Sequence, residues 1–294
     1  MVAGPRSLES EPKSSDLIMY QEFFGLNELP FGITPDTGFF FAFASYQEAL
    51  NTLLVAARTG EGFIKITGEV GTGKTLLCRK FMASLGSDFV TAYIPNPYLE
   101  PRTLLLAVAE DLLIPLDAGV DQHRLHKTLN SGLLNFARGG KRVVLCLDEA
   151  QAMPLETMEA LRLLTNLETE KRKLLQIVLF GQPELDDKLE QASVRQLKQR
   201  ITFHYQLGVL RRDELDNYVA HRLAMAGNRG APLFSQAALD LLYRASGGVP
   251  RLVNILAHKA LLLTYGEGRA QADKKQVRAA VADTPAAKQL RWWW

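Results

Sequence analysis

The run at positions 68–75 reads Gly68-Glu69-Val70-Gly71-Thr72-Gly73-Lys74-Thr75, which fits the pattern G-x-x-x-x-G-K-[ST] at every defined position. Glycines at this spacing let backbone N–H groups curl around phosphate oxygens, and the start of a following helix adds partial positive charge. A lysine at position 74 reaches the β- and γ-phosphates, and the hydroxyl of Thr75 ligates Mg²⁺. The predicted phosphate-binding residues are Glu69, Val70, Gly71, Thr72, Gly73, Lys74, Thr75 and Leu76.

A glycine-rich turn can carry a lysine by chance, so the flanking sequence decides the interpretation. Residues 62–67 form a short apolar run that predicts a buried strand, and residues 75–82 have helical periodicity. Strand, glycine loop and helix start together are the context that this phosphate-binding motif, called a P-loop, needs. The chain is therefore predicted to bind a nucleoside triphosphate with Mg²⁺.

A second motif, which is acidic, follows the apolar strand predicted at 142–147 and consists of Asp148 and Glu149. A carboxylate at the carboxyl end of a parallel strand beside the P-loop strand can hold the Mg²⁺ shell, and this role goes to Asp148. Glu149 is predicted to act as base or to orient the water that attacks the γ-phosphate.

Two amide side chains also follow predicted strands. Asn96 comes after the strand at 88–95; its amide either hydrogen-bonds Glu149 and holds it inactive until a partner binds, or only forms a turn between two prolines. Gln182 follows the strand at 174–180, where a polar side chain can contact the γ-phosphate or the attacking water.

Three arginines are candidates for stabilising charge on the transferred phosphoryl group. Arg200 is the first candidate for a guanidinium supplied to a neighbouring subunit, and Arg195 is the second. Arg251, after Gly247-Gly248-Val249-Pro250, is predicted to reach the γ-phosphate from a second domain. Surface solvation is the alternative role for each.

The elements that must position these residues alternate between strands and helices up to residue 208, which predicts a parallel sheet covered by helices on both faces. Beyond residue 209 the pattern is entirely helical. The predicted organisation is a disordered leader at 1–18, an α/β nucleotide-binding domain at 19–208, a helical lid at 209–284 and a flexible tail at 285–294. The tail ends in Arg291-Trp292-Trp293-Trp294, for which an aromatic anchor is the alternative.

Composition sets further bounds on the 294-residue chain. A net charge of +2, from 34 basic and 32 acidic residues, predicts no strong overall attraction to nucleic acid or anionic lipid. Cys78 and Cys146 fall inside the predicted nucleotide-binding elements and read as buried thiols of a reduced, cytoplasmic protein. No apolar run approaches the ~20 residues of a membrane helix. His123 and His126 lack a third ligand nearby and are expected to be solvated.

The order of these motifs resembles the AAA+ ATPases of the general secretion pathway protein A (ExeA) type. The resemblance covers about residues 19–283, and its nearest members are the ATPases of mannose-sensitive haemagglutinin (MSHA) type IV pilus biogenesis, the MshM type. The matching segments are 20–26 with 30–31, the P-loop, Asn96, 148–151, 181–185, 199–201 and 247–251. The expected membrane helix and peptidoglycan-binding region of the secretion-pathway members have no counterpart in this sequence, which favours the shorter, cytoplasmic pilus-associated members.

The resemblance implies an ATPase core and a helical lid that work as a homo-oligomer such as a hexameric ring, with each arginine finger completing a neighbour's site. It favours ATP over GTP. The lead hypothesis is a cytoplasmic ATPase that drives or switches assembly of a type IV pilus or a secretion apparatus, with attachment to the inner-membrane periphery through partners as an alternative location. The runner-up is a DNA-associated AAA+ regulator of the transposition type, and the third is a scaffold gated by nucleotide with slow hydrolysis.

Overall fold

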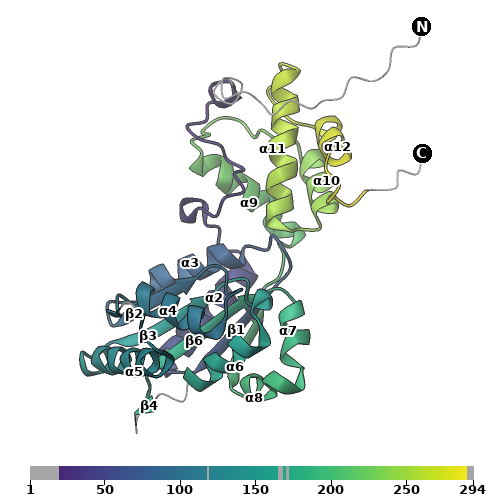
Figure 1. Ribbon diagram of the computed structural model, residues 1–294. Coiled ribbons are helices and arrows are strands. Elements are labelled where there is room, and N and C mark those ends of the chain that lie inside the picture. The colour runs from purple at the N-terminus through teal and green to yellow at the C-terminus, as the bar shows by residue number, and fades with distance from the viewer. Residues whose placement is uncertain (1–19, 118, 165–167, 170–171, 290–294) are drawn as a thin grey trace. The chain divides into compact units, whose positions relative to one another are not determined.

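The computed structural model describes residues 20–117, 119–164, 168–169 and 172–289, which divide into two compact units (Figure 1). One unit runs from Pro35 to Val209, and the other combines the segment before Pro35 with the chain from Leu210 onward. The predicted leader at 1–18 and the residues Arg291–Trp294 lie outside the described residues.

The first unit, Pro35–Val209, is built on a five-stranded sheet in the order β2-β3-β6-β1-β7, and every pairing in it is parallel. The strands are β1 (Phe63–Thr67), β2 (Phe89–Ile94), β3 (Arg142–Leu147), β6 (Leu175–Gly181) and β7 (Ile201–Gln206). The predicted parallel α/β sheet is thus confirmed. One detail differs: β6 lies between β3 and β1, so the strand before Asp148 is not the direct neighbour of the P-loop strand.

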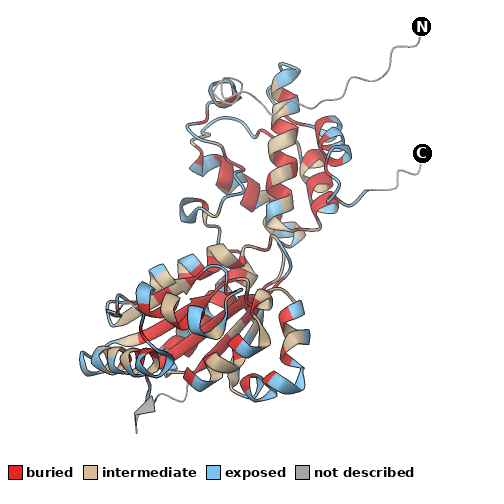
Figure 2. Cartoon of the chain, viewed as in Figure 1, coloured by how far each residue is buried: buried red, intermediate tan, exposed pale blue. Residues whose placement is uncertain are grey.

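Burial explains this order. All seven residues of β6 are buried and β3 is buried from Val143 onward, as expected for central strands covered on both faces (Figure 2). The edge strand β7 instead alternates between half-buried and exposed residues. The strand that is buried at every residue therefore takes the central position.

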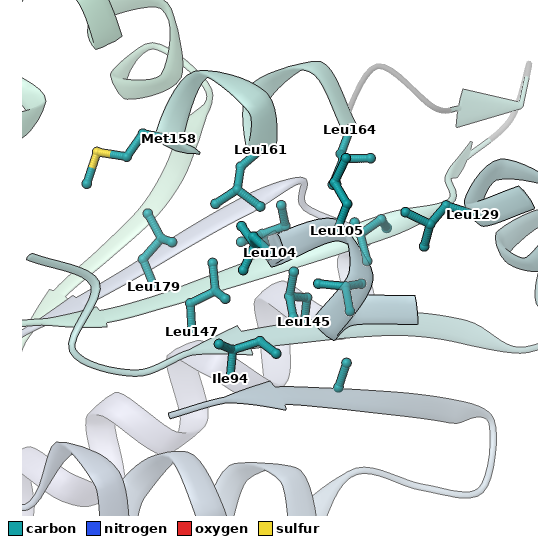
Figure 3. Packing of buried hydrophobic residues seen from close by; sticks show 14 of the residues in the cluster. Ile94, Leu104, Leu105, Leu129, Leu145, Leu147, Met158, Leu161, Leu164 and Leu179 are labelled. Atoms are coloured by element: carbon teal, nitrogen blue, oxygen red, sulfur yellow. The ribbon is translucent and has the colours of Figure 1, made fainter. Parts of the chain in front are cut away.

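Helices cover the sheet and enclose an apolar core. Leu145, Leu147 and Leu179 project from the strands toward side chains such as Leu104 and Leu161 (Figure 3). The helices of eight or more residues in this unit are α2 (Ala44–Thr59), α3 (Lys74–Ser84), α4 (Pro101–Asp111), α5 (Gln122–Arg138) and α6 (Leu155–Leu164). Shorter elements, which the sequence pattern did not predict, are α7 (Glu184–Leu189), α8 (Arg195–Lys198) and the antiparallel pair β4 (Glu168–Thr169) and β5 (Arg172–Lys173).

The second unit is helical, as expected. It contains α9 (Arg212–Met225), α10 (Gln236–Ser246), α11 (Pro250–Gly266) and α12 (Lys274–Ala282). None of the described helices is long and apolar enough to cross a membrane.

The segment at 20–34 was predicted to belong to the α/β domain, but it groups with the helical unit. Arg222 of α9 is buried and donates from Nε to the carbonyl oxygen of Pro30 at 2.5 Å and from Nη2 to that of Gly32 at 3.3 Å. The amide of Asn254 also donates to the Gly32 carbonyl, at 3.2 Å. These two buried polar side chains need acceptors, which the irregular backbone at 30–32 supplies.

A candidate nucleotide-binding site

The P-loop connects β1 to α3 and has the backbone that its glycines allow. Gly71 and Gly73 have φ angles of 81° and 95°, in the left-handed region that favours glycine. Thr72 closes the loop by donating from its hydroxyl to the carbonyl of Glu69 at 2.8 Å. Helix α3 then starts at Lys74, so its free N–H groups face the loop.

A tyrosine from α2 supports this loop from outside the motif. The hydroxyl of Tyr46 donates to the carbonyl oxygen of Gly73, and the Tyr46 side chain is buried against the rings of Phe40 and Phe43. A Cβ on Gly73 would overlap that hydroxyl. Gly73 is therefore required twice, by its φ angle and by the approach of Tyr46.

Lys74 is held inside the loop. Its ammonium group is buried and donates to the carbonyls of Gly68 at 2.7 Å and Glu69 at 3.0 Å. Burial lowers the pKa of Lys74, against the attraction of the nearby carboxylates led by Glu149. Among the described residues, this buried ammonium group has neutral carbonyl oxygens as its hydrogen-bond partners. The negatively charged oxygens of a polyphosphate would stabilise its charge better.

The two residues assigned to the metal lie in direct contact. The hydroxyl of Thr75 donates to Oδ2 of Asp148 at 2.6 Å, and the hydroxyl of Tyr93 reaches the same oxygen at 3.3 Å. Asp148 is only 2% exposed, and burial raises the pKa of its carboxyl group despite these donors. A bound cation would stabilise the ionised form of a carboxylate that is buried in this way.

The magnesium ion implied by this motif fits these residues. Mg²⁺ commonly uses one or two protein oxygens and takes its remaining ligands from phosphates and water. The hydroxyl of Thr75 and the carboxylate of Asp148 provide that kind of donor set. In the described part of the chain, no group of three or more His, Cys, Asp or Glu residues is placed to hold a metal unaided.

Glu149 has an unusual backbone and two amide partners. Its φ and ψ are 51° and 39°, in the left-handed region, which turns the chain sharply after β3. Oε2 of its carboxylate accepts from Nε2 of Gln151 at 2.6 Å and from Nε2 of Gln182 at 3.1 Å. Burial on its own would raise the pKa of Glu149, but these two hydrogen bonds and the positive charge of Lys74 lower it on balance.

The sheet order explains why these groups meet. The P-loop, Gln182 and the Asp148–Glu149 pair follow β1, β6 and β3, which are consecutive strands at one carboxyl edge. Asn96 follows β2, the next strand, but it is exposed and its Oδ1 accepts from the backbone N–H of Tyr98 at 3.1 Å. The predicted hydrogen bond from Asn96 to Glu149 is not formed between these described residues; the side chain of Asn96 instead closes an Asx turn with the N–H of Tyr98.

Arg200 lies away from this edge. Arg200 precedes β7, at the opposite edge of the sheet, because Ile201 pairs with Phe63 at the start of β1. Its guanidinium donates to the carbonyl of Arg162 at 2.9 Å. Arg195 is exposed on α8, and Arg251 is exposed at the start of α11 in the helical unit.

Three residues of the site escaped sequence reasoning: Tyr46, Tyr93 and Gln151. Gln151 stands two positions after Glu149, and only the left-handed turn at Glu149 brings the two side chains together. Tyr93 reaches Asp148 because β2 pairs with β3 in parallel. A tyrosine near the end of a strand, beside the strand that precedes Asp148, was a usable signal, whereas nothing in the sequence pointed to the contact of Tyr46.

Comparison with known proteins agrees with this geometry. Residues 57–189 match the family model described as AAA domain. That stretch, which holds the P-loop and the Asp148–Glu149 pair, is thus similar to an AAA domain. It is also 43% identical over 250 residues to General secretion pathway protein A of Aeromonas hydrophila, and the predicted resemblance to that type is confirmed. The match takes in 85% of this chain but 46% of that protein, so this chain spans less than half the length of its relative.

Solved structures share the fold at low identity. The ORC2 protein of Aeropyrum pernix, solved as ADPNP and ADP complexes, has a TM-score of 0.62 and 19% identity, over 87% of this chain and 73% of its own. Cdc6p of Pyrobaculum aerophilum has a TM-score of 0.63 and 17% identity, over 84% and 70%. The RuvB branch migration motor of Thermotoga maritima has a TM-score of 0.55 and 16% identity, over 83% and 70%. At these identities the likeness concerns the fold.

Proposed function

We propose that this chain binds ATP with Mg²⁺ and hydrolyses it. The observation that carries the proposal is the meeting of Lys74, the Thr75–Asp148 pair and the Glu149–Gln182 pair at the carboxyl ends of three consecutive strands. Each group needed to hold a polyphosphate and to orient a water molecule is present at that edge.

Each side chain has one task in this scheme. Lys74 exchanges its carbonyl partners for the β- and γ-phosphates, while the amides of residues 69–76 surround the phosphate oxygens. Mg²⁺, held by Thr75 and Asp148, supplies positive charge that offsets the negative charge of the phosphates. Glu149 accepts the proton of a water molecule as its oxygen attacks the γ-phosphorus and the bond to the β–γ bridging oxygen breaks, which releases ADP and phosphate.

Gln182 and the arginines complete the scheme. The amide of Gln182 contacts the γ-phosphate or the attacking water. It is close enough to do so because it donates to Glu149, the residue that binds this water, from the end of the neighbouring strand. Arg200 lies at the amino edge of its own sheet, about five residues or roughly 16 Å of strand from the P-loop, so it serves a neighbouring subunit. Arg195 is the alternative finger, and Arg251 takes the lid role. The active form is thus a homo-oligomer such as a hexameric ring.

The cellular role that we propose is assembly or switching of a type IV pilus of the MSHA kind, or of a related secretion apparatus. The similarity to General secretion pathway protein A supports this class of partner. The site of action is the cytoplasm, with attachment to the inner-membrane periphery through those partners. A DNA-bound regulator is the less favoured role, since the net charge of +2 gives no overall attraction to phosphate backbones.

The decisive experiment compares the wild type with Lys74→Ala and Glu149→Gln, measuring binding of a fluorescent ATP analogue and phosphate release with Mg²⁺. Lys74→Ala should lose binding, and Glu149→Gln should keep binding while turnover falls by about 10²–10⁴-fold. Normal turnover by Glu149→Gln would refute the assigned base. Salt-sensitive, ATP-dependent binding of duplex DNA by Glu149→Gln would move the role to DNA.

A further inference from the structure

A glutamine outside the assigned roles is fixed by hydrogen bonds at both ends of its amide beside Glu149. The amide nitrogen of Gln151 donates to Oε2 of Glu149 at 2.6 Å, while its own Oε1 accepts from the backbone N–H of Gln182 at 3.0 Å. One amide group therefore joins the end of β3 to the end of β6. The fixed backbone donor also decides which end of the Gln151 amide faces Glu149.

The surroundings hold Gln151 in this position. Lys188 of α7 donates to the carbonyls of Gln151 at 2.6 Å and Met153 at 2.8 Å, which fixes the short turn that carries the glutamine. Gly181, at the end of β6, leaves room for the side chain, since a Cβ there would lie 3.3 Å from Oε1 of Gln151 and 2.7 Å from Leu185. An amide held from both sides loses little conformational entropy when it orients its neighbour.

The two glutamines that touch Glu149 differ in this respect. Both donate to Oε2, so Oε1 of Glu149 accepts no hydrogen bond from the described residues. The side chain of Gln182 has the γ-phosphate or the attacking water as an alternative partner. Gln151 is restrained further, because its Oε1 also accepts from the backbone N–H of Gln182.

We propose that Gln151 is a positioning residue for hydrolysis, which holds Oε2 of Glu149 so that Oε1 faces the attacking water when Gln182 turns to the phosphate. This inference rests on the proposed ATPase function and adds to it the residue that orients the base. The hydrogen bond also favours the ionised carboxylate, the form able to accept a proton. Gln151 acts through Glu149 and touches no reacting atom.

The test uses the full chain and three variants. Gln151→Ala removes both hydrogen bonds, whereas Gln151→Glu keeps an acceptor for the Gln182 N–H and replaces the donor by a repelling carboxylate. Gln191→Glu makes the same chemical change at an exposed glutamine and is the matched control. Steady-state kcat and KM are measured across pH, and thermal unfolding by circular dichroism checks that each variant folds.

We expect Gln151→Ala to lower kcat by roughly 10- to 100-fold with little change in KM, since a hydrogen bond to a charged group is lost. Gln151→Glu should lower kcat at least as far, because its carboxylate would repel Oε2 of Glu149. Gln191→Glu changes neither quantity. A rise in kcat for Gln151→Ala would overturn the proposal, because Gln151 would then restrain Glu149, and a change in KM alone would assign it to binding.

A second readout does not need turnover. The side-chain amide of Gln151 is observed by ¹⁵N NMR in nucleotide-free protein and identified by its absence in Gln151→Ala. Loss of the carboxylate in Glu149→Ala should shift this amide signal, because the amide donates to that carboxylate, and an unchanged signal would refute the proposal. Failure of the wild type to hydrolyse ATP would refute the proposed function, while this amide signal would still test the contact between Gln151 and Glu149.

Discussion

The contact between Tyr46 and Gly73 predicts that the stability lost through a substitution at Gly73 can be partly restored by removing the hydroxyl oxygen of Tyr46, a residue 27 positions earlier in the chain. In Gly73→Ala the new Cβ overlaps the Tyr46 hydroxyl, and the residue keeps a φ of 95°. Backbone strain costs about 1–2 kcal/mol and overpacking about 1–3 kcal/mol. We therefore expect Gly73→Ala to lower the free energy of unfolding by about 2–5 kcal/mol.

Tyr46→Phe alone should cost only about 0.5–1.5 kcal/mol. It removes one hydrogen bond, and the Gly73 carbonyl keeps its bond from the N–H of Leu77 at 2.9 Å. In the double variant the overlap with oxygen disappears, and the nearest ring atom, Cζ, would lie 3.1 Å from the new Cβ. The double variant should then lose about 1.5–3.5 kcal/mol, which is less than the sum of the two single changes.

The assay is urea unfolding of all variants by far-UV circular dichroism, with titration of a fluorescent ATP analogue alongside. Tyr205→Phe combined with Gly73→Ala is the matched control. The hydroxyl of Tyr205 is engaged elsewhere, donating to Glu48 at 2.8 Å, so its removal should add to the cost of Gly73→Ala without rescue. Additive costs for the Tyr46 pair as well would refute the argument that Tyr46 supports the loop.

Three further predictions follow from the same geometry. The pKa of Glu149 is lowered in the nucleotide-free protein, so the acid limb of kcat/KM should lie below the range of an ordinary glutamate. Glu149 should also contribute stability that is present above that range and lost as pH falls. Activity per subunit should rise with protein concentration, and Arg200→Ala should abolish that rise more fully than Arg195→Ala, measured by phosphate release after dilution. Gly248→Ala should lower the stability of the helical unit by about 2–5 kcal/mol in thermal unfolding, because φ is 78° and a Cβ would overlap the Leu210 carbonyl.

Each of these has a clear contrary outcome. An acid limb at or above the ordinary glutamate range would mean that Glu149 is not the titrating base. Constant activity per subunit upon dilution, or an unaffected Arg200→Ala, would remove the finger acting between subunits. An unchanged unfolding temperature for Gly248→Ala would mean that the backbone at Leu210 moves aside without a cost in stability. Gly230→Ala is the control, since a Cβ at that position lies 3.9 Å from Oδ1 of Asn228.

Local patterns in the sequence predicted the parts of the fold and site that depend on local geometry. The P-loop spacing needs only a strand before it and a helix after it, and both are present as β1 and α3. The amphipathic run at 122–138 begins and ends where α5 does, because Asp121 caps its start and Gly139 follows its end. Asp148 was predictable as the polar residue that ends a buried strand.

Features that depend on strand order or on single backbone angles were not predictable. The position of β6 between β3 and β1 follows from pairing of distant segments, and it brings Gln182 next to Glu149. The left-handed turn at Glu149 brings the amide of Gln151 to its carboxylate, whereas the sequence suggested Asn96 as the amide partner. The segment at 20–34 belongs to the helical unit because of buried acceptors for Arg222, which periodicity does not reveal.

The adjacent carboxylates at 148 and 149 have opposite pKa shifts, and this difference fits their division of tasks. Burial raises the pKa of Asp148, so its ionised form is costly until a cation arrives, which is the behaviour of a metal ligand. Hydrogen bonds from two glutamines, together with Lys74, outweigh burial and lower the pKa of Glu149, which favours its ionised form, and the same hydrogen bonds orient it. Neighbouring groups with pKa values driven apart by their surroundings are a recurring sign of separate chemical roles. In this chain the sharp backbone turn at Glu149 produces that separation, because it directs one carboxylate toward Thr75 and the other toward the two glutamines.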